Sequence, residues 1–196
     1  MIHLIMNKNK KYNTLIIAHR GFSGRYPENT LIAIEEAIRF SDMIEIDVQL
    51  SKDNIPVVFH DSNLKRTTNV AGKLNQRTLQ ELKELDAGSW FSINFRNEKI
   101  PTLEEVLKII KDRILLNIEI KKSSVFKENS IIEEKILELI KKYKIQEQII
   151  ISSFSSLALK RIKILEPEIK TAILTRARFL DLSITKAKKI KHTIYS

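Results

Sequence analysis

Short apolar runs alternate with amphipathic stretches along most of this chain of 196 residues. The apolar runs are rich in β-branched residues and predict strands, which cover residues 14–19, 43–50, 55–60, 114–120, 148–153 and 171–175. The amphipathic stretches repeat apolar residues at helical spacing and predict helices, which cover residues 30–40, 102–112, 130–143 and 155–165. Strands that alternate with helices in this way predict a parallel sheet with helices outside it.

Three helix starts have the spacing of a capping box, in which a Thr or Ser side chain and a Glu three residues later satisfy free backbone N–H groups. The three pairs are Thr78 with Glu81, Thr102 with Glu105, and Ser130 with Glu133. The first pair begins a short helix, near residues 78–85, inside an unusually long connection over residues 61–101. So long a connection predicts an insertion with its own structure within a single domain that spans 1–196.

Polar residues alternate with apolar ones in two of the predicted strands. Glu45 and Asp47 share one side of the strand 43–50, and Glu119 occupies the polar side of the strand 114–120. A strand with one face in water would alternate in the same way. A parallel sheet between helices is normally apolar on both faces, however, and an isolated buried carboxylate is very costly. A TIM-type (β/α) barrel resolves the conflict, because polar residues at the C-terminal ends of its strands point into the active site.

The residues that could perform chemistry gather at the C-terminal ends of the first four predicted strands: His19, Arg20, Glu45, Asp47, His60, Asp61, Glu119 and Lys121. Three carboxylates in a chain without cysteine favour a hard divalent cation, Mg²⁺ or Ca²⁺. Two histidines suit an acid and a base, and the two cationic side chains suit the oxygens of a phosphate. Each residue alone has an ordinary structural explanation, but together they predict metal-assisted hydrolysis of a phosphate ester.

The net charge of +10 is concentrated at the two ends of the chain, since residues 15–155 balance to zero. The central part of the chain therefore carries no excess positive charge around the predicted site, and we expect no specific nucleic-acid partner. The basic ends could contact nucleic acid or anionic lipid, but solvated lysine-rich helix faces explain them equally well. The absence of cysteine, of a secretory signal and of a transmembrane segment predicts a cytoplasmic protein.

Several long motifs resemble the glycerophosphodiester phosphodiesterase family, strongly over residues 15–122 and more weakly to about residue 175. The motifs are AHRGFSGRYPENTLIAIEEAI, IEIDVQLSKDNIPVVFHDSNLKRTTNVAGKL, LDAGSWF, KIPTLEEVL and LNIEIK. This resemblance implies a TIM-type barrel with a small inserted subdomain, residues 61–101, after the third strand. It also implies hydrolysis of a small-molecule glycerophosphodiester to an alcohol and sn-glycerol 3-phosphate, with one divalent cation.

The resemblance also implies roles for individual residues. His19 and His60 correspond to the acid/base pair, in an order that stays open, and Arg20 to a phosphate-binding residue. The implied metal ligands are Glu45, Asp47 and Glu119, and Lys121 would neutralise charge beside them. Further pocket positions are Glu28, Trp90, Phe91, Ser153 and Phe154. Trp90 and Phe91 could instead pack the insertion, and either Asn29 or Thr30 is placed to cap the helix 30–40.

The chain departs from the family after the sixth predicted strand, where only a weak seventh, IKHTIYS, follows. We therefore expect a barrel that is incomplete at its C-terminus, with unpaired strand edges that favour self-association. Three functions stay open: a glycerophosphodiesterase, a related phosphodiesterase that acts on lysophospholipids, and an inactive fragment or binding module.

Overall fold

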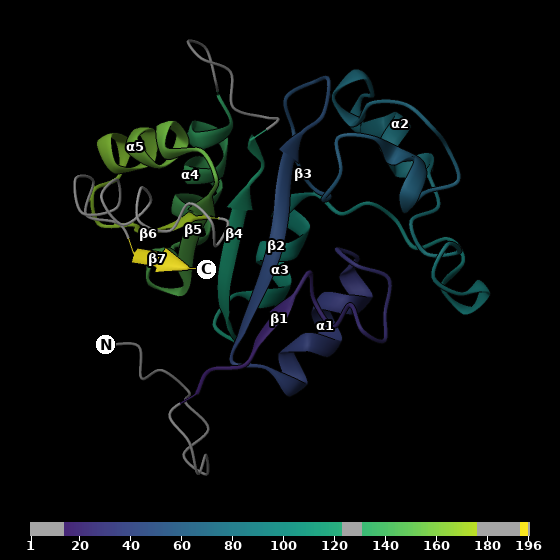
Figure 1. Ribbon diagram of the computed structural model, residues 1–196, viewed down its shortest axis with the longest axis horizontal. Helices are drawn as coiled ribbons and strands as arrows, with labels where there is room; N and C mark the ends of the chain where they lie inside the picture. The colour runs from purple at the N-terminus through teal and green to yellow at the C-terminus, as the bar shows by residue number, and fades with distance from the viewer. Residues whose placement is uncertain (1–13, 123–130, 176–192, 196) are drawn as a thin grey trace.

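A computed structural model describes residues 14–122, 131–175 and 193–195. Its main feature is a curved sheet with the strand order β1-β2-β4-β5-β6-β7, in which each neighbouring pair is parallel. These strands are β1 (Ile17–His19), β2 (Met43–Leu50), β4 (Leu115–Ile120), β5 (Ile149–Ser153), β6 (Lys170–Leu174) and β7 (Thr193–Tyr195). Within the described residues β1 pairs with β2 alone, so the sheet forms part of an α/β barrel rather than a closed one (Figure 1).

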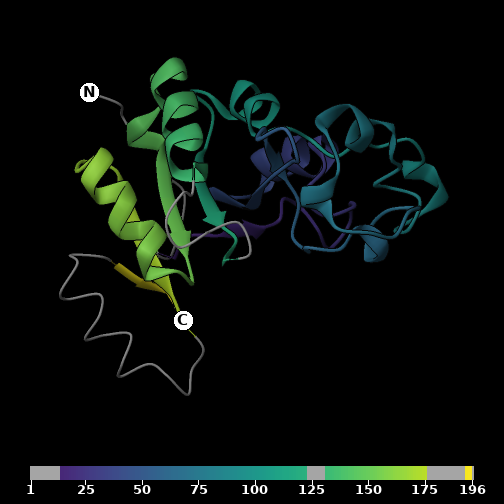
Figure 2. The ribbon, with the colours of Figure 1, turned by 90° about the horizontal axis from the view of Figure 1, so that it is seen from above.

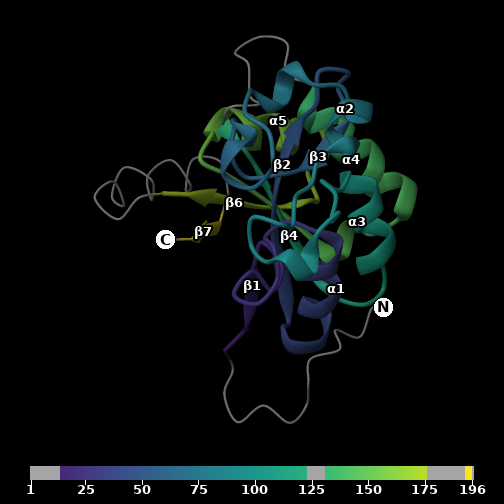
Figure 3. The same ribbon diagram turned by 90° about the vertical axis from the view of Figure 1, so that its right-hand side faces the viewer.

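Four helices cover the outer side of this sheet: α1 (Leu31–Phe40), α3 (Leu103–Ile110), α4 (Ile132–Tyr143) and α5 (Ser156–Leu165). They pack side by side in chain order, and Figure 3 shows α1, α3 and α4 on one side of the strands. Their apolar faces and the outward residues of the strands form one buried cluster, to which α3 contributes Leu103, Val106, Leu107 and Ile110. The predicted helices and the predicted parallel α/β architecture are thus confirmed.

The predicted capping boxes can be checked at two helices. Thr78 and Glu81 form one at the start of α2 (Leu79–Glu84), and Thr102 and Glu105 form the other at the start of α3. Both predictions are confirmed, while the third box depends on Ser130, which lies outside the described residues.

Two strands differ from the predictions. The first is shorter than residues 14–19, and Leu15, Ile16 and Ile17 are 44%, 53% and 42% exposed, because β1 has a neighbour on only one edge in the described chain. The third, β3 (Pro56–Val58), is antiparallel to β2, whereas the alternating pattern predicted a strand of the parallel sheet. Only residues 51–55 connect β2 to β3, and a parallel crossover needs about a dozen residues or more.

The segment 61–101 forms turns, α2 and three short 3₁₀-helices, η1 (Leu64–Arg66), η2 (Leu74–Gln76) and η3 (Ile93–Phe95). It projects away from α4 and α5, as Figure 2 shows by its blue and teal colours. A second buried cluster lies in and beside it, formed by Val57, Phe59, Leu64, Leu74, Leu82, Leu85, Ala87 and Ile100. A further 3₁₀-helix, η5 (Gln146–Gln148), precedes β5. No helix in the described ranges is long and apolar enough to span a bilayer.

Candidate functional site

The site begins where β1 ends, at a sharp turn. Arg20 and Gly21 both have left-handed backbone conformations, with φ angles of 57° and 76°. A Cβ atom on Gly21 would lie 2.8 Å from the backbone carbonyl of Ala33 in α1, so only glycine allows this close approach. The backbone N–H of Arg20 donates to Glu45 Oε2 at 3.0 Å. The turn therefore directs the side chains of His19 and Arg20 to the rim of the sheet beside β2.

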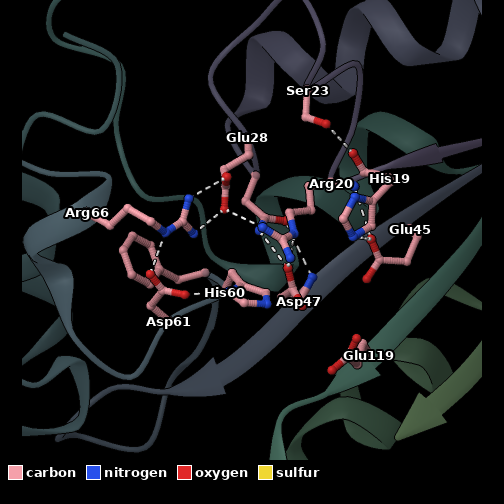
Figure 4. Close-up of polar contacts among 12 residues, drawn as sticks. His19, Arg20, Ser23, Glu28, Glu45, Asp47, His60, Asp61, Arg66 and Glu119 are labelled. Carbon is pink, nitrogen blue, oxygen red and sulfur yellow. Dashed lines mark hydrogen bonds and ion pairs between the residues drawn. The ribbon is translucent and has the colours of Figure 1, made fainter. Parts of the chain in front are cut away.

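Three carboxylates meet on the inner face of β2 and β4. Glu45 and Asp47 alternate along β2, and the register pairs Asp47 with Glu119. One oxygen from each of the three carboxylates lies within 4.8 Å of the other two (Figure 4). The alternation of polar and apolar residues in the two strands predicted that Glu45 and Asp47 share one side of β2 and that Glu119 lies on the polar side of β4.

The charges around this acidic trio are only partly balanced. Burial, and next the negative charge of Asp47, raises the pKa of Glu45 to about 8. Oε1 of Glu45 is buried and accepts no hydrogen bond from the described residues. A buried carboxylate oxygen with no donor, close to two other carboxylates, suits a hard cation with oxygen ligands. The donor set therefore fits the predicted Mg²⁺ or Ca²⁺, and Glu45, Asp47 and Glu119 are the residues that could hold it.

Two cationic side chains lie beside the trio. Lys121 Nζ is 3.1 Å from Asp47 Oδ1 and 2.8 Å from Glu119 Oε1. Desolvation lowers the pKa of Lys121, but the two carboxylates outweigh it and raise that pKa overall. Arg20 Nε lies 3.2 Å from Asp47 Oδ2, and Arg20 Nη1 donates to Glu28 at 3.0 Å. Both cations are therefore held in place where a phosphate could approach.

The two histidines reach the site by different routes. His19 follows β1 directly, and its Nε2 is 3.9 Å from Glu45 Oε2. The partial burial of its ring, and next the charge of Arg20, lowers the pKa of His19. His60 arrives because β3 runs back along β2, so that the N–H of Phe59 donates to the carbonyl of Asp47 at 2.8 Å. The antiparallel pairing thus places His60 beside the trio without a barrel strand of its own.

Sequence reasoning overlooked three residues that support the site. Gln49 continues the polar face of β2, and its Nε2 lies 2.8–3.1 Å from the carbonyl oxygens of Phe59, His60 and Asp61. Asn29 does not cap α1, since Thr30 accepts the hydrogen bond from Ala33 N.

Asn29 instead donates its side-chain amide to Asp47 Oδ2 at 3.0 Å. The third overlooked residue is Arg66, which joins Glu28 to Asp61. The alternation in β2 already places Gln49 on the polar side with Glu45 and Asp47, without a role in the site, and no pattern in the sequence indicates the roles of the other two.

The remaining predicted pocket positions lie on the insertion, at the last residue of β5 and directly after it. Trp90 Nε1 donates to the carbonyl of Ala87, and its ring meets that of Phe91 edge-on at 5.6 Å between centroids. Ser153 is buried and donates to the carbonyl of Ile120 at 2.7 Å, whereas the side chain of Phe154 is largely exposed. Their contribution to a pocket stays a prediction.

Comparison with known proteins gives consistent results. Residues 19–192 match the model of the glycerophosphoryl diester phosphodiesterase family. A glycerophosphodiester phosphodiesterase of Caldanaerobacter subterraneus is 47% identical over 170 residues, which cover 86% of this chain and 69% of the relative. A putative glycerophosphodiester phosphodiesterase of Bacillus subtilis, YhdW, is 44% identical over 190 residues, which cover 91% of this chain and 76% of the relative.

Solved structures agree with the sequence matches. A phosphodiesterase of Oleispira antarctica, in complex with its product sn-glycerol-3-phosphate, superposes with a TM-score of 0.75 at 34% identity and covers 92% of this chain and 83% of that one. A glycerophosphodiester phosphodiesterase of Agrobacterium tumefaciens superposes with a TM-score of 0.74 at 30% identity, and the match covers 82% of this chain and 67% of that one. The fold, the acidic trio and these similarities lead to one conclusion: this chain belongs to the glycerophosphoryl diester phosphodiesterase family.

Proposed function

We propose that this chain hydrolyses glycerophosphodiesters to an alcohol and sn-glycerol 3-phosphate with the help of one divalent cation. The enzyme class follows from family membership. The observation that supports the cation most strongly is the acidic trio, in which a buried oxygen of Glu45 lacks a donor within the described chain. A cation held by Glu45, Asp47 and Glu119 would supply positive charge to the phosphate group.

The other residues have separate tasks in this proposal. Arg20 and Lys121 bind the phosphate oxygens and stabilise the charge that builds up at phosphorus. One histidine of the pair His19 and His60 removes a proton from the attacking oxygen, which belongs to a water or to the glycerol hydroxyl of the substrate. The other donates a proton to the oxygen of the departing alcohol, so that the alcohol leaves neutral. Attack by the glycerol hydroxyl forms a cyclic phosphate, which a water then opens to sn-glycerol 3-phosphate. Either histidine can take either task in this arrangement.

The test is release of sn-glycerol 3-phosphate from glycerophosphocholine by the 196-residue chain, with Mg²⁺, with Ca²⁺ and with a chelator. Glu45→Gln and Asp47→Asn keep the shape of the side chains but remove the charge. We expect each to abolish cation binding in calorimetry and to lower product release at least about 100-fold. Glu138→Gln is the matched control, because Glu138 lies on α4, is 64% exposed and forms a surface ion pair with Lys135.

Two outcomes would reject the proposal. If neither cation binds and no product forms, the chain is an inactive or binding module. If Glu45→Gln and Asp47→Asn retain the wild-type rate, the acidic trio is not the metal site.

The insertion supports a second substrate class, lysophospholipids. Trp90 is 39% exposed and Ile93 is 70% exposed, and apolar side chains in water are suited to contact with an acyl chain. A faster rate on lysophosphatidylcholine than on glycerophosphocholine would favour this alternative.

A further inference from the structure

Arg66 donates from all three nitrogen atoms of its guanidinium group and so joins two parts of the site. Nη1 and Nη2 donate to the two carboxylate oxygens of Glu28 at 2.8 and 2.7 Å. Nε donates to Asp61 Oδ2 at 2.6 Å. Glu28 belongs to the loop after β1, whereas Asp61 and Arg66 both belong to the segment after β3, so Arg66 links that segment to the loop after β1 (Figure 4).

The Asp61 end of this bridge leads to His60. Asp61 accepts from Arg66 through Oδ2, and its other oxygen, Oδ1, lies 2.5 Å from His60 Nδ1. A carboxylate beside Nδ1 holds the proton on that nitrogen, and the neutral ring then presents Nε2 as its acceptor. Arg66 fixes the position of Asp61, so it acts on the tautomer of His60 without contacting the ring.

The Glu28 end of the bridge leads to the phosphate-binding group. Glu28 Oε1 accepts from Arg66 and, at 3.0 Å, from Nη1 of Arg20. Desolvation raises the pKa of Glu28, but its contacts with the two arginines outweigh this and lower that pKa overall. Glu28 is thus a charged carboxylate that aligns Arg20, and Arg66 holds it from the other side.

We infer that Arg66 is a positioning residue, which orients His60 through Asp61 and Arg20 through Glu28. The inference rests on the proposed function only for its kinetic consequence, since the tautomer is a property of the protein without substrate. A lysine at this position would keep the charge but could not reproduce three N–H donors in a planar fork. The planar arrangement of the three N–H donors, rather than the positive charge alone, therefore positions Asp61 and Glu28.

The test compares Arg66→Met and Arg66→Lys with the wild-type chain. In protein labelled with ¹⁵N-histidine, at about pH 8.5 where imidazole rings are neutral, long-range ¹H–¹⁵N spectra report which ring nitrogen carries the proton. The His60 signals are assigned by their loss in His60→Gln. Arg77→Met is the matched control, because Arg77 also lies in the insertion but pairs only loosely, at 3.9 Å, with Glu81 on the surface.

We expect His60 to be protonated on Nδ1 in the wild-type chain and in Arg77→Met. In both Arg66 variants and in Asp61→Asn, we expect a mixture of the two tautomers. In the active enzyme, kcat should fall about 10- to 100-fold in both Arg66 variants, as for other groups that orient a reacting residue. Arg77→Met should keep the wild-type kcat.

Two results would overturn the inference. The first is an unchanged His60 tautomer in Arg66→Lys and Arg66→Met. If kcat and the melting temperature fall while the tautomer stays the same, the role of Arg66 is merely structural. The second is an unchanged kcat in both variants of an active enzyme. If the chain is inactive, the proposed function fails, but the tautomer measurement still decides the inference. If Arg66→Met does not fold, Arg66→Lys gives the answer.

Discussion

Asn29 shows how a single residue can support the site from outside it. It has a left-handed backbone, with φ of 59°, and its side-chain amide donates to Asp47. Asp47 is fully surrounded, since it also contacts Arg20 and Lys121. Among the described residues, the orientation of this carboxylate therefore depends on one neutral donor, Asn29, and on two cationic ones, Arg20 and Lys121.

Replacing Asn29 by glycine should weaken cation binding about 10- to 100-fold, because glycine keeps the left-handed backbone and removes only the amide. Isothermal titration with Mg²⁺ and Ca²⁺ measures the effect. Asn54→Gly is the control, since Asn54 has a similar φ of 62° in the exposed turn between β2 and β3. Equal affinities in the two variants would show that Asn29 does not orient Asp47.

In the insertion, the carboxylate of Asp86 accepts hydrogen bonds from Gly88, Ser89 and Asn97. Desolvation raises the pKa of its carboxyl group, but the hydrogen bonds from Ser89, Gly88 and Asn97 outweigh it and lower that pKa well below 3.8. A lowered carboxyl pKa stabilises the folded state above the pKa of the unfolded chain, and this stability is lost as the pH falls.

The free energy of unfolding of Asp86→Asn should therefore be lower than that of the wild-type chain near pH 6, and the difference should shrink below about pH 4. Denaturant titrations at several pH values measure it. A difference that stays constant down to pH 3 would mean that the charge of Asp86 contributes nothing.

At the scale of elements, the turn from β1 to α1 determines where the first two site residues lie. The turn packs against α1, since the N–H of Phe22 donates to the carbonyl of Ala33 at 2.9 Å. Gly21 allows this contact through its positive φ and its missing Cβ atom. The turn after β1 can thus approach the backbone of α1 closely at this position.

Replacing Gly21 by alanine should destabilise the fold by about 2 kcal/mol or more, because the new Cβ atom meets backbone atoms and the left-handed conformation becomes strained. Gly24→Ala is the control, since a Cβ atom there has no neighbour within 4 Å; we expect a change within about 0.5 kcal/mol. Denaturant titrations compare the free energies of unfolding of Gly21→Ala and Gly24→Ala. Equal values would contradict the explanation that Gly21 is needed for the close contact of the turn with α1.

At the scale of the whole molecule, the described part of the sheet has an edge at β1. Leu15, Ile16 and Ile17 are partly exposed there, and an apolar strand edge is a template for pairing with another chain. The acidic trio lies on the paired strands β2 and β4, and Glu45 also borders the edge strand β1, where the register pairs it with His19.

We therefore expect the purified chain to self-associate, with a sedimentation coefficient that rises with concentration. Ile16→Lys should reduce the association, because it places a charge on the exposed edge without removing a backbone hydrogen bond. A monomer at all concentrations, with a sharp and reversible melt, would refute this prediction.

Much of the architecture could be predicted because it depends on local periodicity. The alternation of Glu45 and Asp47 in β2 and of Glu119 in β4 predicted one polar face, since side chains in a strand alternate between faces. The capping boxes at Thr78 and Thr102 were likewise local patterns. The direction of β3 was wrongly predicted from the alternation alone, although its short connection to β2 excludes a crossover.

The sequence by itself determined the order of strands and helices, the residues on the polar face of the sheet and the family. Only the tertiary structure decided how the supporting residues meet: Asn29 at Asp47, Gln49 at the carbonyl groups before the insertion, and Arg66 between Glu28 and Asp61. The physical reason is range. Periodicity and caps act over a few residues, whereas Arg66 binds Glu28, which lies 38 positions away and becomes its neighbour only when β3 folds back along β2.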